Sequence, residues 1–436
     1  MLDFLRKILP NDHPLRLLYH KLKAVAAANI YRFPANGMTV IGVTGTNGKT
    51  TTCNIIHKVL TEAGKKAGLV TTVNFKIGEK EEVNLTGRSN ISPFLLQRKL
   101  RAMAEAGCEY VVLEVTSHGL VQSRLWGVNV DTAVFTNLTQ DHLDYHGTME
   151  KYKEAKGLLF EGLNASRRKP GVQKISIVNK DDATAEYFEG FSVDQGFGYG
   201  VQRGAYAARN LKVRPDGTSF LLRIPNGEIE VDFHVPGRMN VYNALAAATV
   251  GVAHRINLQT IKAALEKMQP VAGRLELISE GQPYTIVVDY AHSEDSLMQV
   301  LTMMKELTAG RLIVVFGATG DRDKDKRPKM GAVLHKLADL IIVTNDDLYT
   351  EDPREIAAML REGIPREEGD GVWQVLDRRE ATRLALEMAK EGDTVVVAGK
   401  GAEEVQVVGK KKVPYDDRKV VRELLSRVRD VALPGA

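Results

Sequence analysis

The stretch "VTGTNGKTTT", residues 43–52, directly follows the apolar run "MTVIG" and decides the fold of the first half of the chain. Glycine accepts backbone angles that other residues resist, so a turn containing Gly45 and Gly48 lets backbone N–H groups converge on an anion. The apolar spacing of the following "TTCNIIHKVLTEAG" predicts a helix. The turn therefore lies between a strand and a helix N-terminus, where the helix dipole favours negative charge.

The polar end of this turn carries the groups that a bound phosphate requires. Lys49 adds a positive charge, and the hydroxyl of Thr50 or Thr51 can hold Mg²⁺. The generic phosphate-loop pattern has a glycine six residues before its lysine, where this chain has Val43, with Gly42 one residue earlier. The strand–turn–helix context favours a nucleoside triphosphate over a turn without a ligand.

Length and composition limit the class of protein. A chain of 436 residues is too long for one ordinary core, which indicates two or three domains. The net charge of +4 is too balanced to indicate a nucleic-acid partner. Cys53 and Cys108 form no CxxC pair, which argues against a disulfide scaffold or a cysteine-ligated zinc site and fits a reducing cytoplasm.

The N-terminal segment reads as a basic amphipathic helix, "HPLRLLYHKLKAVAAANIYRFP". A helix docked on the protein is more common than one lying on a membrane surface, and we favour the former. No apolar run approaches the roughly 20 residues needed to span a bilayer, and "MLDFLRKILP" is too short and too charged for a signal peptide. The sequence therefore predicts a cytoplasmic protein, and we expect a monomer.

Apolar, β-branched runs alternate with helical patterns along most of the chain, which indicates mainly parallel sheets covered by helices on both faces. Between residues 204 and 235 the pattern changes to alternating apolar and polar residues around "PDG" and "NG" turns, which predicts a small antiparallel sheet. The apolar runs are "MTVIGV", "CEYVVLEV", "DTAVFTNL", "KISIVNK", "YTIVVDYA", "RLIVVFG", "ADLIIVTN" and "DTVVVAG".

A linker-like stretch near residue 272, "KMQPVAGRLELISEGQP", precedes a second series of strands and helices. We therefore divide the chain into an N-terminal helical segment over 1–37, a central ATP-binding domain over 38–272 and a Rossmann-like α/β C-terminal domain over 273–436.

Polar clusters follow several predicted strands, where ligands of open α/β sheets collect. Glu114 ends "VVLE", where an acid is a natural Mg²⁺ ligand or, equally, a surface carboxylate. The segment "TQDHLDYHG" brings Asp141, His142, Asp144 and His146 into six residues, a density that is hard to explain structurally, although two of the four can be helix-capping residues.

Four further positions are ambiguous when read alone. Lys156, on the helical "TMEKYKEAKGLLF", reads as a solvated residue. Asn240 and Asn243 lie one helical turn apart and can read a base or a phosphate, with capping as the alternative for Asn240. His292, three residues after Asp289, is more often structural than catalytic in such a setting.

Together these segments resemble the Mur ligase family, most closely its MurE-type branch, which adds the third amino acid to a UDP-N-acetylmuramoyl dipeptide. The resemblance runs from about residue 38 to residue 420. It rests on "GVTGTNGKTTT", "EVTSHGLVQSRL", "VFTNLTQDHLDYHGTMEKYKEAKGLLF", "PGRMNVYNALAA", "DYAHSEDSL", "FGATGDRDKDKRPKMG" and "AGKGAEEVQ". The family loop has the pattern TGT-x-GKT, which accounts for Val43.

The resemblance implies an ATP-dependent ligase that phosphorylates a carboxylate to an acyl phosphate, which an amine then attacks. It implies that catalysis is mostly positioning and charge neutralisation. The implied phosphate-binding and Mg²⁺-binding groups are Gly45, Thr46, Asn47, Gly48, Lys49, Thr50 and Thr51, with Glu114, His142 and a carbamylated Lys156 as further metal ligands. The positions implied near the nucleotide are Asn240, Asn243, Arg274 and Asp289.

For the two substrates the resemblance implies two further sets. The muramoyl-peptide acceptor is expected at Thr86, Thr116, Gln122 and Arg124, although the family more often has serine at 116 and threonine where this chain has Leu85. The incoming amino acid is expected at His292, Asp346, Asp347, Tyr349, Gly399 and Glu403.

Three departures from the family pattern affect the substrate. MurE-type enzymes usually carry a UDP-binding domain before the phosphate loop, where this chain has a short helical segment. Three alternatives follow: uridine is weakly recognised, the helical segment binds it instead, or the acceptor is not UDP-linked. The DNPR motif of diaminopimelate-adding members is "DDLY" here, so Tyr349 replaces an arginine that pairs with the distal carboxylate. This disfavours diaminopimelate. Ala402 replaces the histidine of "GKGHE".

Two alternatives remain open at this point. One is a ligase of the same core acting on a different carboxylate, as folylpolyglutamate synthase or the ligase half of cyanophycin synthetase does. The other is a non-catalytic nucleotide-binding partner, which loss of Lys49, Glu114, His142 or Lys156 would support; all four are present.

Overall fold

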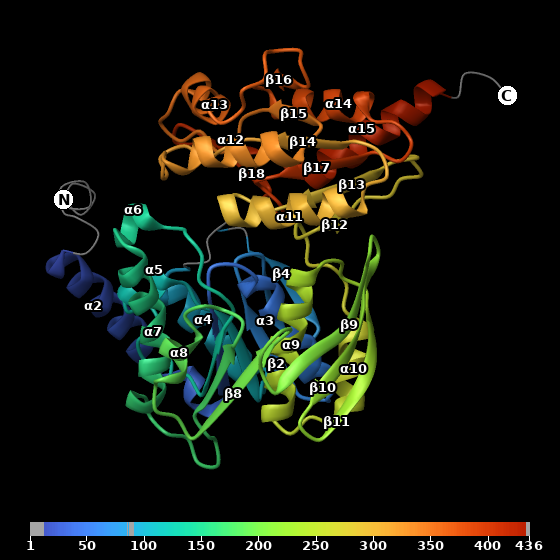
Figure 1. Ribbon diagram of the computed structural model, residues 1–436. Helices are drawn as coiled ribbons and strands as arrows, with labels where there is room; N and C mark the ends of the chain where they lie inside the picture. Colours follow the sequence, from blue (N-terminus) through green and yellow to red (C-terminus); the bar gives the residue numbers. More distant parts are fainter. Residues whose placement is uncertain (1–12, 85, 87–90, 433–436) are drawn as a thin grey trace. The chain divides into compact units, whose positions relative to one another are not determined.

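The computed structural model describes residues 13–84, 86 and 91–432, and it divides the chain into two compact units between Gln269 and Pro270. Each unit is an α/β assembly built on one large sheet (Figure 1). Among the described residues, no helix is long and apolar enough to cross a bilayer.

The first unit is built on an eleven-stranded sheet with the order β11-β10-β9-β8-β7-β6-β1-β5-β2-β3-β4. Its strands are β1 (Thr39–Thr44), β2 (Ala67–Val70), β3 (Asn74–Ile77), β4 (Lys80–Val83), β5 (Tyr110–Glu114), β6 (Thr132–Phe135), β7 (Ile175–Asn179), β8 (Gln195–Gly200), β9 (Tyr206–Arg214), β10 (Gly217–Ile224) and β11 (Gly227–Phe233). The six central strands from β2 to β8 pair in parallel, and antiparallel strands extend the sheet at both ends.

Helices cover both faces of this sheet. They are α2 (Pro14–Ile30), the 3₁₀ helix η1 (Pro34–Gly37), α3 (Lys49–Glu62), α4 (Pro93–Glu105), α5 (Ser117–Val121), α6 (Leu143–His146), α7 (Met149–Ala165), α8 (Ala185–Glu189), α9 (Arg238–Ala253) and α10 (Leu258–Glu266). Successive β1 residues alternate between the two faces: Val40 packs in the core formed with α4, α7 and α8, while Ile41 points to the opposite face. Because both faces are buried, the central strands are continuously apolar.

The second unit has a six-stranded sheet with the order β12-β13-β17-β14-β15-β16, parallel except for β12. Its elements are β12 (Glu276–Leu277), β13 (Thr285–Asp289), α11 (Glu294–Leu307), β14 (Leu312–Phe316), α12 (Lys326–Leu337), β15 (Leu340–Val343), α13 (Pro353–Arg361), β16 (Val372–Gln374), α14 (Arg378–Met388), β17 (Thr394–Ala398) and α15 (Asp417–Ala432). A separate hairpin consists of β18 (Val405–Val408) and β19 (Lys411–Pro414).

The two cores of this unit again follow the alternation of its strands. Val314 and Phe316 pack with α11, α12 and α13, whereas Ile313 and Val315 pack with α14 and α15. The register sets Ala398 beside both Asp289 and Phe316, so the carboxyl ends of β13, β14 and β17 meet at one edge. This edge is where the polar segments of the unit gather.

The predicted α/β class is confirmed. All eight apolar runs form strands. The antiparallel strands β9 to β11 also form as predicted, but they belong to the main sheet. The link is the parallel pairing of β8 with β9, where Tyr199 faces Tyr206 and Gly200 faces Ala207.

Candidate active site

The phosphate loop of the first unit is packed so closely that its glycines have no room for a side chain. Gly45 has a φ of +152°, and a Cβ there would lie 1.9 Å from Oγ1 of Thr136. Gly48 has a φ of +80°, and its Cβ would lie 2.3 Å from Oδ1 of Asn243. Between these two glycines, the N–H of Thr46 donates to the backbone carbonyl of Asn137 (2.8 Å), which fixes the loop. The loop is therefore a backbone cradle at the start of α3, which fits a bound phosphate.

Two lysines converge on one carbonyl of this loop. Lys49 Nζ donates to the carbonyl oxygens of Gly45 (3.0 Å) and Thr46 (2.6 Å). Lys156, on α7, reaches the Gly45 carbonyl from the other side at 2.6 Å. The two sequence-predicted lysines, more than a hundred residues apart, are thus brought to the same point.

Lys156 is only 1% exposed, so its interpretation as a solvated residue is wrong. On α7 it shares the buried stripe of Tyr152, Leu159 and Phe160, and its Nζ lies 4.1 Å from the centre of the Tyr152 ring. Burial, and next the charge of Lys49, hold the pKa of Lys156 well below its ordinary value. Its amine is therefore disposed to be uncharged.

Glu114 and Thr50 lie in hydrogen-bond contact, with Thr50 Oγ1 donating to Glu114 Oε2 at 2.9 Å. The β1–β5 register, which pairs Val43 with Glu114, brings the carboxylate beside the phosphate loop. Thr72 holds it there through its N–H (2.8 Å) and its hydroxyl (2.9 Å). A hydroxyl and a carboxylate are the hard oxygen donors that Mg²⁺ prefers, so these residues fit the predicted cation.

Besides burial, the charge of Lys156 acts on His118 and His146, so a cluster of histidines lies near this lysine. His142 has a left-handed backbone (φ 54°), and its ring lies 4.8 Å from that of His118, centre to centre. His146 lies 5.3 Å from the same ring and hydrogen bonds Ser117 Oγ at 2.9 Å. Burial lowers the pKa of His118 to about 3 and that of His146 to about 4, so both rings are neutral.

The candidate acceptor residues fall into one connected group and one separate position. Gln122 donates to Tyr145 Oη at 3.1 Å and accepts from Arg124 Nε at 2.9 Å. Thr116 caps α5 by accepting from the N–H of Gly119. Thr86 instead bonds to Asn84 (2.6 Å), and Leu85 lies outside the described residues.

The two asparagines of α9 are both buried and bonded to each other, with Asn243 Nδ2 donating to Asn240 Oδ1 at 3.0 Å. Asn240 also donates to the Pro236 carbonyl (2.8 Å), but the N-cap of α9 is Gly237, so the alternative of capping by Asn240 is wrong. Asn243 accepts from Thr52 Oγ1 (3.1 Å) and lies against Gly48, so it supports the phosphate loop directly.

In the second unit, the carboxyl end of β13 carries Asp289, whose two oxygens accept from the N–H groups of Leu275 and Ala291, both at 2.7 Å. Burial raises its pKa, and the nearby Arg274 guanidinium opposes that rise. Arg274 stacks on Tyr290 at 4.4 Å, and His292 packs on the same ring at 4.5 Å. The three predicted residues are therefore gathered around one tyrosine.

Three carboxylates meet at the ends of β15 and β17. One oxygen each of Asp346, Asp347 and Glu403 lies within 4.8 Å of the others, a spacing that suits a metal ion. Lys400, fully buried, already lies among them and donates to Asp347 (2.8 Å) and Glu403 (2.9 Å). Burial opposes its charge, but the three acids outweigh burial and raise the pKa of Lys400. An ammonium, not a metal, is thus the cation built into this cluster.

The charge of this cluster is unbalanced. Three acids surround one lysine, and burial raises the pKa of Glu403 to about 7. Gly399 lets the end of β17 lie close to Asp346, because a Cβ added to Gly399 (φ +117°) would lie 2.8 Å from Asp346 Oδ2. The cluster is therefore suited to a further positive charge.

Tyr349 has a left-handed backbone (φ 49°) and pairs with Val408 of the β18–β19 hairpin. The guanidinium carbon of Arg322 lies 5.2 Å from the centre of its ring. Arg322 comes from "DRDKDKRP", and Arg327 of the same stretch is buried and pairs with Glu351 at 2.8 and 3.0 Å. That stretch is thus held at Asp321 and at Arg327, and it presents Arg322 beside Tyr349.

Sequence reasoning missed Lys400, Arg322 and the buried role of His146. Lys400 stands inside the quoted "AGKGAE" directly after β17, and its place between Gly399 and Glu403 was the available signal. Arg322 carried only the signal of a charged loop after β14. Three-dimensional pairing, which no local pattern encodes, distinguishes these residues from solvated ones.

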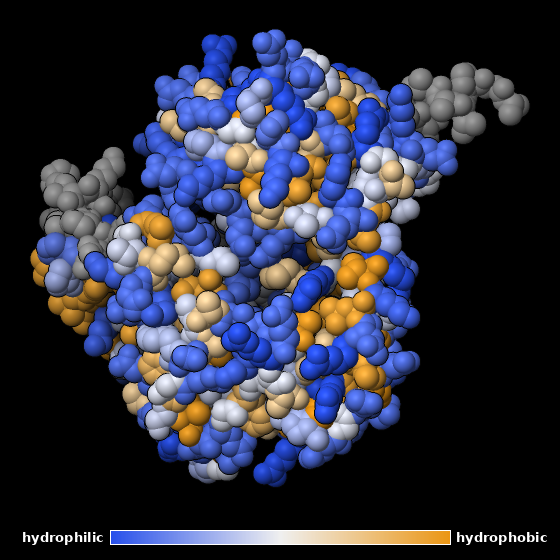
Figure 2. Space-filling model, viewed as in Figure 1, coloured by the Kyte–Doolittle hydropathy of each residue, from blue (hydrophilic) through white to orange (hydrophobic). Residues whose placement is uncertain are grey.

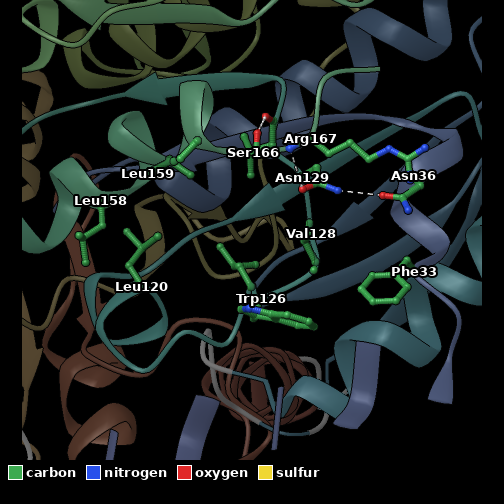
Figure 3. Close-up of a pocket in the computed structure, with 15 residues that line it drawn as sticks. Phe33, Asn36, Leu120, Trp126, Val128, Asn129, Leu158, Leu159, Ser166 and Arg167 are labelled. Atoms are coloured by element: carbon green, nitrogen blue, oxygen red, sulfur yellow. Dashed lines mark hydrogen bonds between the residues drawn. The ribbon is translucent and has the colours of Figure 1, made fainter. Parts of the chain in front are cut away.

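An apolar pocket of about 550 Å³ lies elsewhere in the first unit (Figure 3). Phe33 and Trp126 contribute rings on one side and Leu158 an aliphatic chain, while Asn129 donates to Asn36 at its polar margin (2.8 Å). None of the sequence-predicted site residues lines it. Its lining lacks the carboxylates and histidines of the phosphate-loop region, so it is no candidate for the chemistry.

Comparison with protein families matches both units. Residues 43–251 match the Mur ligase middle domain, and residues 273–401 match the Mur ligase glutamate ligase domain. The chain is 42% identical over 418 residues to the UDP-N-acetylmuramoyl-L-alanyl-D-glutamate–2,6-diaminopimelate ligase of Geobacillus kaustophilus, covering 94% of this chain and 84% of that protein. The ligase of the same name from Clostridium botulinum is 39% identical over 412 residues, covering 94% of this chain and 82% of that protein.

Solved structures agree. A UDP-N-acetylmuramoyl-L-alanyl-D-glutamate–2,6-diaminopimelate ligase has a TM-score of 0.62 at 32% identity, covering 90% of this chain and 79% of that one. Mycobacterium tuberculosis folylpolyglutamate synthase with ADP has a TM-score of 0.70 at 18% identity, covering 95% of both chains, which shows a shared fold alone.

Fold, phosphate loop and these matches together define the class: the protein is an ATP-dependent ligase that joins a carboxylate to an amine. The chain belongs to the Mur ligase family, and it is similar to the MurE-type members of that family. Mur ligases in general depend on ATP and use Mg²⁺.

Proposed function

We propose that this chain joins an amino acid with a cationic side chain to a carboxylate of a muramoyl-peptide acceptor. Residues 38–272 are assigned the nucleotide and the acceptor, and residues 273–436 the incoming amino acid. The γ-phosphoryl group of ATP passes to an oxygen of the acceptor carboxylate, and the amine then displaces phosphate to form the amide. The single observation that carries the choice of amino acid is the three-acid cluster around Lys400.

The convergence of Lys49, Lys156 and the Thr50–Glu114 pair on the phosphate loop supports the assignment of this region to ATP and Mg²⁺. In this proposal Lys49 binds phosphate oxygens, and Thr50, Glu114 and His142 hold Mg²⁺. The cation would neutralise charge that develops on the transferred phosphoryl group. Because each step leaves little covalent work to the protein, these side chains act by position and charge.

Lys156 is assigned a carbamate. Only an uncharged amine adds CO₂, and burial beside Lys49 lowers the pKa of Lys156 in the required direction. Addition of CO₂ forms an N–C bond and releases a proton, so a buried amine becomes an anion. The carbamate nitrogen would keep one N–H for the Gly45 carbonyl, and the ammonium of Lys49 would stabilise the new negative charge.

The acceptor is assigned to the side of the phosphate loop that carries the Gln122–Arg124 pair. Arg124 is positioned by its bonds to Gln122 and to the Ile91 carbonyl (3.3 Å), and its guanidinium can bind a peptide carboxylate. Thr116 and Thr86 complete the proposed acceptor set.

The incoming amino acid is assigned to the acidic cluster at the ends of β15 and β17. Asp346, Asp347 and Glu403 carry more negative charge than Lys400 neutralises, and a side-chain ammonium would offset part of the remainder. Arg322, beside Tyr349, is the group available for the α-carboxylate. The similar relatives are named diaminopimelate ligases, and diaminopimelate carries a second carboxylate. This chain has Asp347 and Tyr349 in the DNPR position, so the acidic cluster would repel that second carboxylate.

The test is phosphate release from ATP by the purified protein with UDP-N-acetylmuramoyl-L-Ala-D-Glu and a panel of lysine, ornithine, diaminopimelate and neutral amino acids, with mass spectrometry of the products. We expect release that depends on lysine or ornithine, and a product heavier by that residue. Release only with diaminopimelate would overturn the choice of amino acid. Silence across the panel, with ATP still bound, would overturn this acceptor and favour another carboxylate.

A further inference from the structure

Helix α2 packs on the first unit through only one of its faces. Ala24, Ala27 and Ala28 are buried. Ala28 lies so close to Gly127 that a Cβ added to Gly127 would lie 2.8 Å from the Cβ of Ala28. Small side chains let the helix approach the protein closely. This alanine face is therefore the docked side that the sequence-based interpretation expects.

The opposite face of α2 is apolar and exposed. Leu15, Leu18, Leu22 and Ile30 are 63%, 51%, 58% and 65% exposed, and they make up four of the ten exposed large hydrophobic side chains among the described residues. At about 100° per residue these positions share one side of the helix, away from the three alanines. Figure 2 shows hydrophobic surface over α2. We call these four residues the leucine face.

The charges of α2 are all of one sign. Arg16, Lys21 and Lys23 are basic, and the helix contains no aspartate or glutamate. On a helical projection Arg16 and Lys23 lie on one flank of the leucine face and Lys21 on the other. An apolar face with basic flanks is the arrangement of helices that lie in the plane of a membrane surface.

Charge favours a lipid surface over a second copy of the chain as the occupant of this face. Pairing with α2 of a second copy would bring the basic flanks together without an acid on either helix to compensate. An anionic lipid surface instead offers apolar chains to the leucines and phosphate groups to the lysines. We propose that α2 binds the protein to an anionic membrane surface through its leucine face, with Lys21 and Lys23 contacting lipid headgroups.

The experiment is co-sedimentation of the full chain with vesicles of phosphatidylcholine alone or of phosphatidylcholine with phosphatidylglycerol. We expect binding to the anionic vesicles at least about ten-fold tighter than to the neutral ones, weakened by salt. Leu18→Ser with Leu22→Ser, and separately Lys21→Glu with Lys23→Glu, should each reduce that binding about ten-fold or more. Val213→Ser, which removes an exposed valine from β9, is the matched control and should bind as the parent does.

Circular dichroism and ligase activity in vesicle-free buffer, which the variants should retain, separate a lost surface from a lost fold. Equal binding to neutral and anionic vesicles, or unchanged binding by the leucine variant, would overturn the proposal. Sedimentation velocity provides the other contradiction: a dimer of the parent chain that the leucine variant abolishes would assign the leucine face to a second copy.

Discussion

The phosphate-loop region and the acidic cluster differ in how they use a buried lysine. Lys156 donates to the Gly45 carbonyl and lies over the Tyr152 ring, and burial and the charge of Lys49 lower its pKa against the opposing charge of Asp141. Lys400 is equally buried but lies among three carboxylates, and its pKa is raised. Burial alone therefore does not determine the state of a lysine; the sign of its neighbours does. The first lysine is suited to react, and the second to hold charge.

The two regions also differ in how closely they follow the family pattern. The phosphate-loop region retains Lys49, Glu114, His142 and Lys156; Lys49 and Lys156 both donate to the Gly45 carbonyl, and Glu114 accepts from Thr50 of the same loop. The acidic cluster departs from it at "DDLY" and at Ala402. We interpret this as conserved activation chemistry combined with a changed choice of amino acid.

The largest expected effect is that of Lys156→Ala. Loss of the proposed carbamate should lower kcat about 10³-fold or more, because no other side chain can supply that anion. Steady-state phosphate release measures it, with Lys151→Ala, on the exposed side of the same helix, as control. ¹³C NMR in labelled bicarbonate should give a carbamate signal that the variant lacks; near-normal turnover by Lys156→Ala would refute the carbamate.

Glu114→Gln should have the next largest effect. The amide keeps the shape but removes the charge facing Thr50, so we expect kcat to fall about 10²-fold and the Mg²⁺ concentration for half-maximal activity to rise. A Mg²⁺ titration of activity measures both. Glu109→Gln, which alters a surface pair with Lys65, should leave both unchanged. An unaltered Mg²⁺ requirement in the Glu114 variant would remove Glu114 from the metal site.

Arg322→Gln tests the other region. Loss of the guanidinium beside Tyr349 should raise the KM for the amino acid about ten-fold, because a charge-assisted contact to its carboxylate is lost. The KM for ATP should stay constant. A variant with normal KM for the amino acid would show that Arg322 does not contact it.

The smallest effect is a pH dependence. Burial raises the pKa of Glu403 to about 7, so its carboxylate form, which attracts a cation, increases through neutral pH. We therefore expect kcat/KM for the amino acid to rise about ten-fold between about pH 6 and about pH 8. Glu403→Gln should retain only the rise due to deprotonation of the substrate amine. Identical profiles for parent and variant would exclude Glu403 from amine binding.

Much of the fold follows from the sequence because its strands are buried on both faces. Runs such as "RLIVVFG" leave no other way to bury five successive apolar residues, and β14 forms there. The joining of β8 to β9 could not be predicted, since hydrogen bonding between distant strands leaves no periodic signal.

The site was partly predictable for a related reason. Glycine and threonine in the phosphate loop serve local backbone needs, so Gly45, Gly48 and Thr50 are recognisable from their spacing. Lys400 and Arg322 depend on partners far along the chain, such as Asp347 and Tyr349. A charged side chain has the same local pattern whether solvent or a buried acid surrounds it.

In the proposed function the acidic cluster selects a cationic amino acid. The most direct measurement is a competition between equal concentrations of lysine and diaminopimelate, with the ligated products counted by mass spectrometry for the parent and for Asp347→Asn with Tyr349→Arg. We expect the lysine product to dominate for the parent, and the double variant to move the ratio at least about ten-fold toward diaminopimelate. A parent enzyme that makes mainly the diaminopimelate product would contradict it.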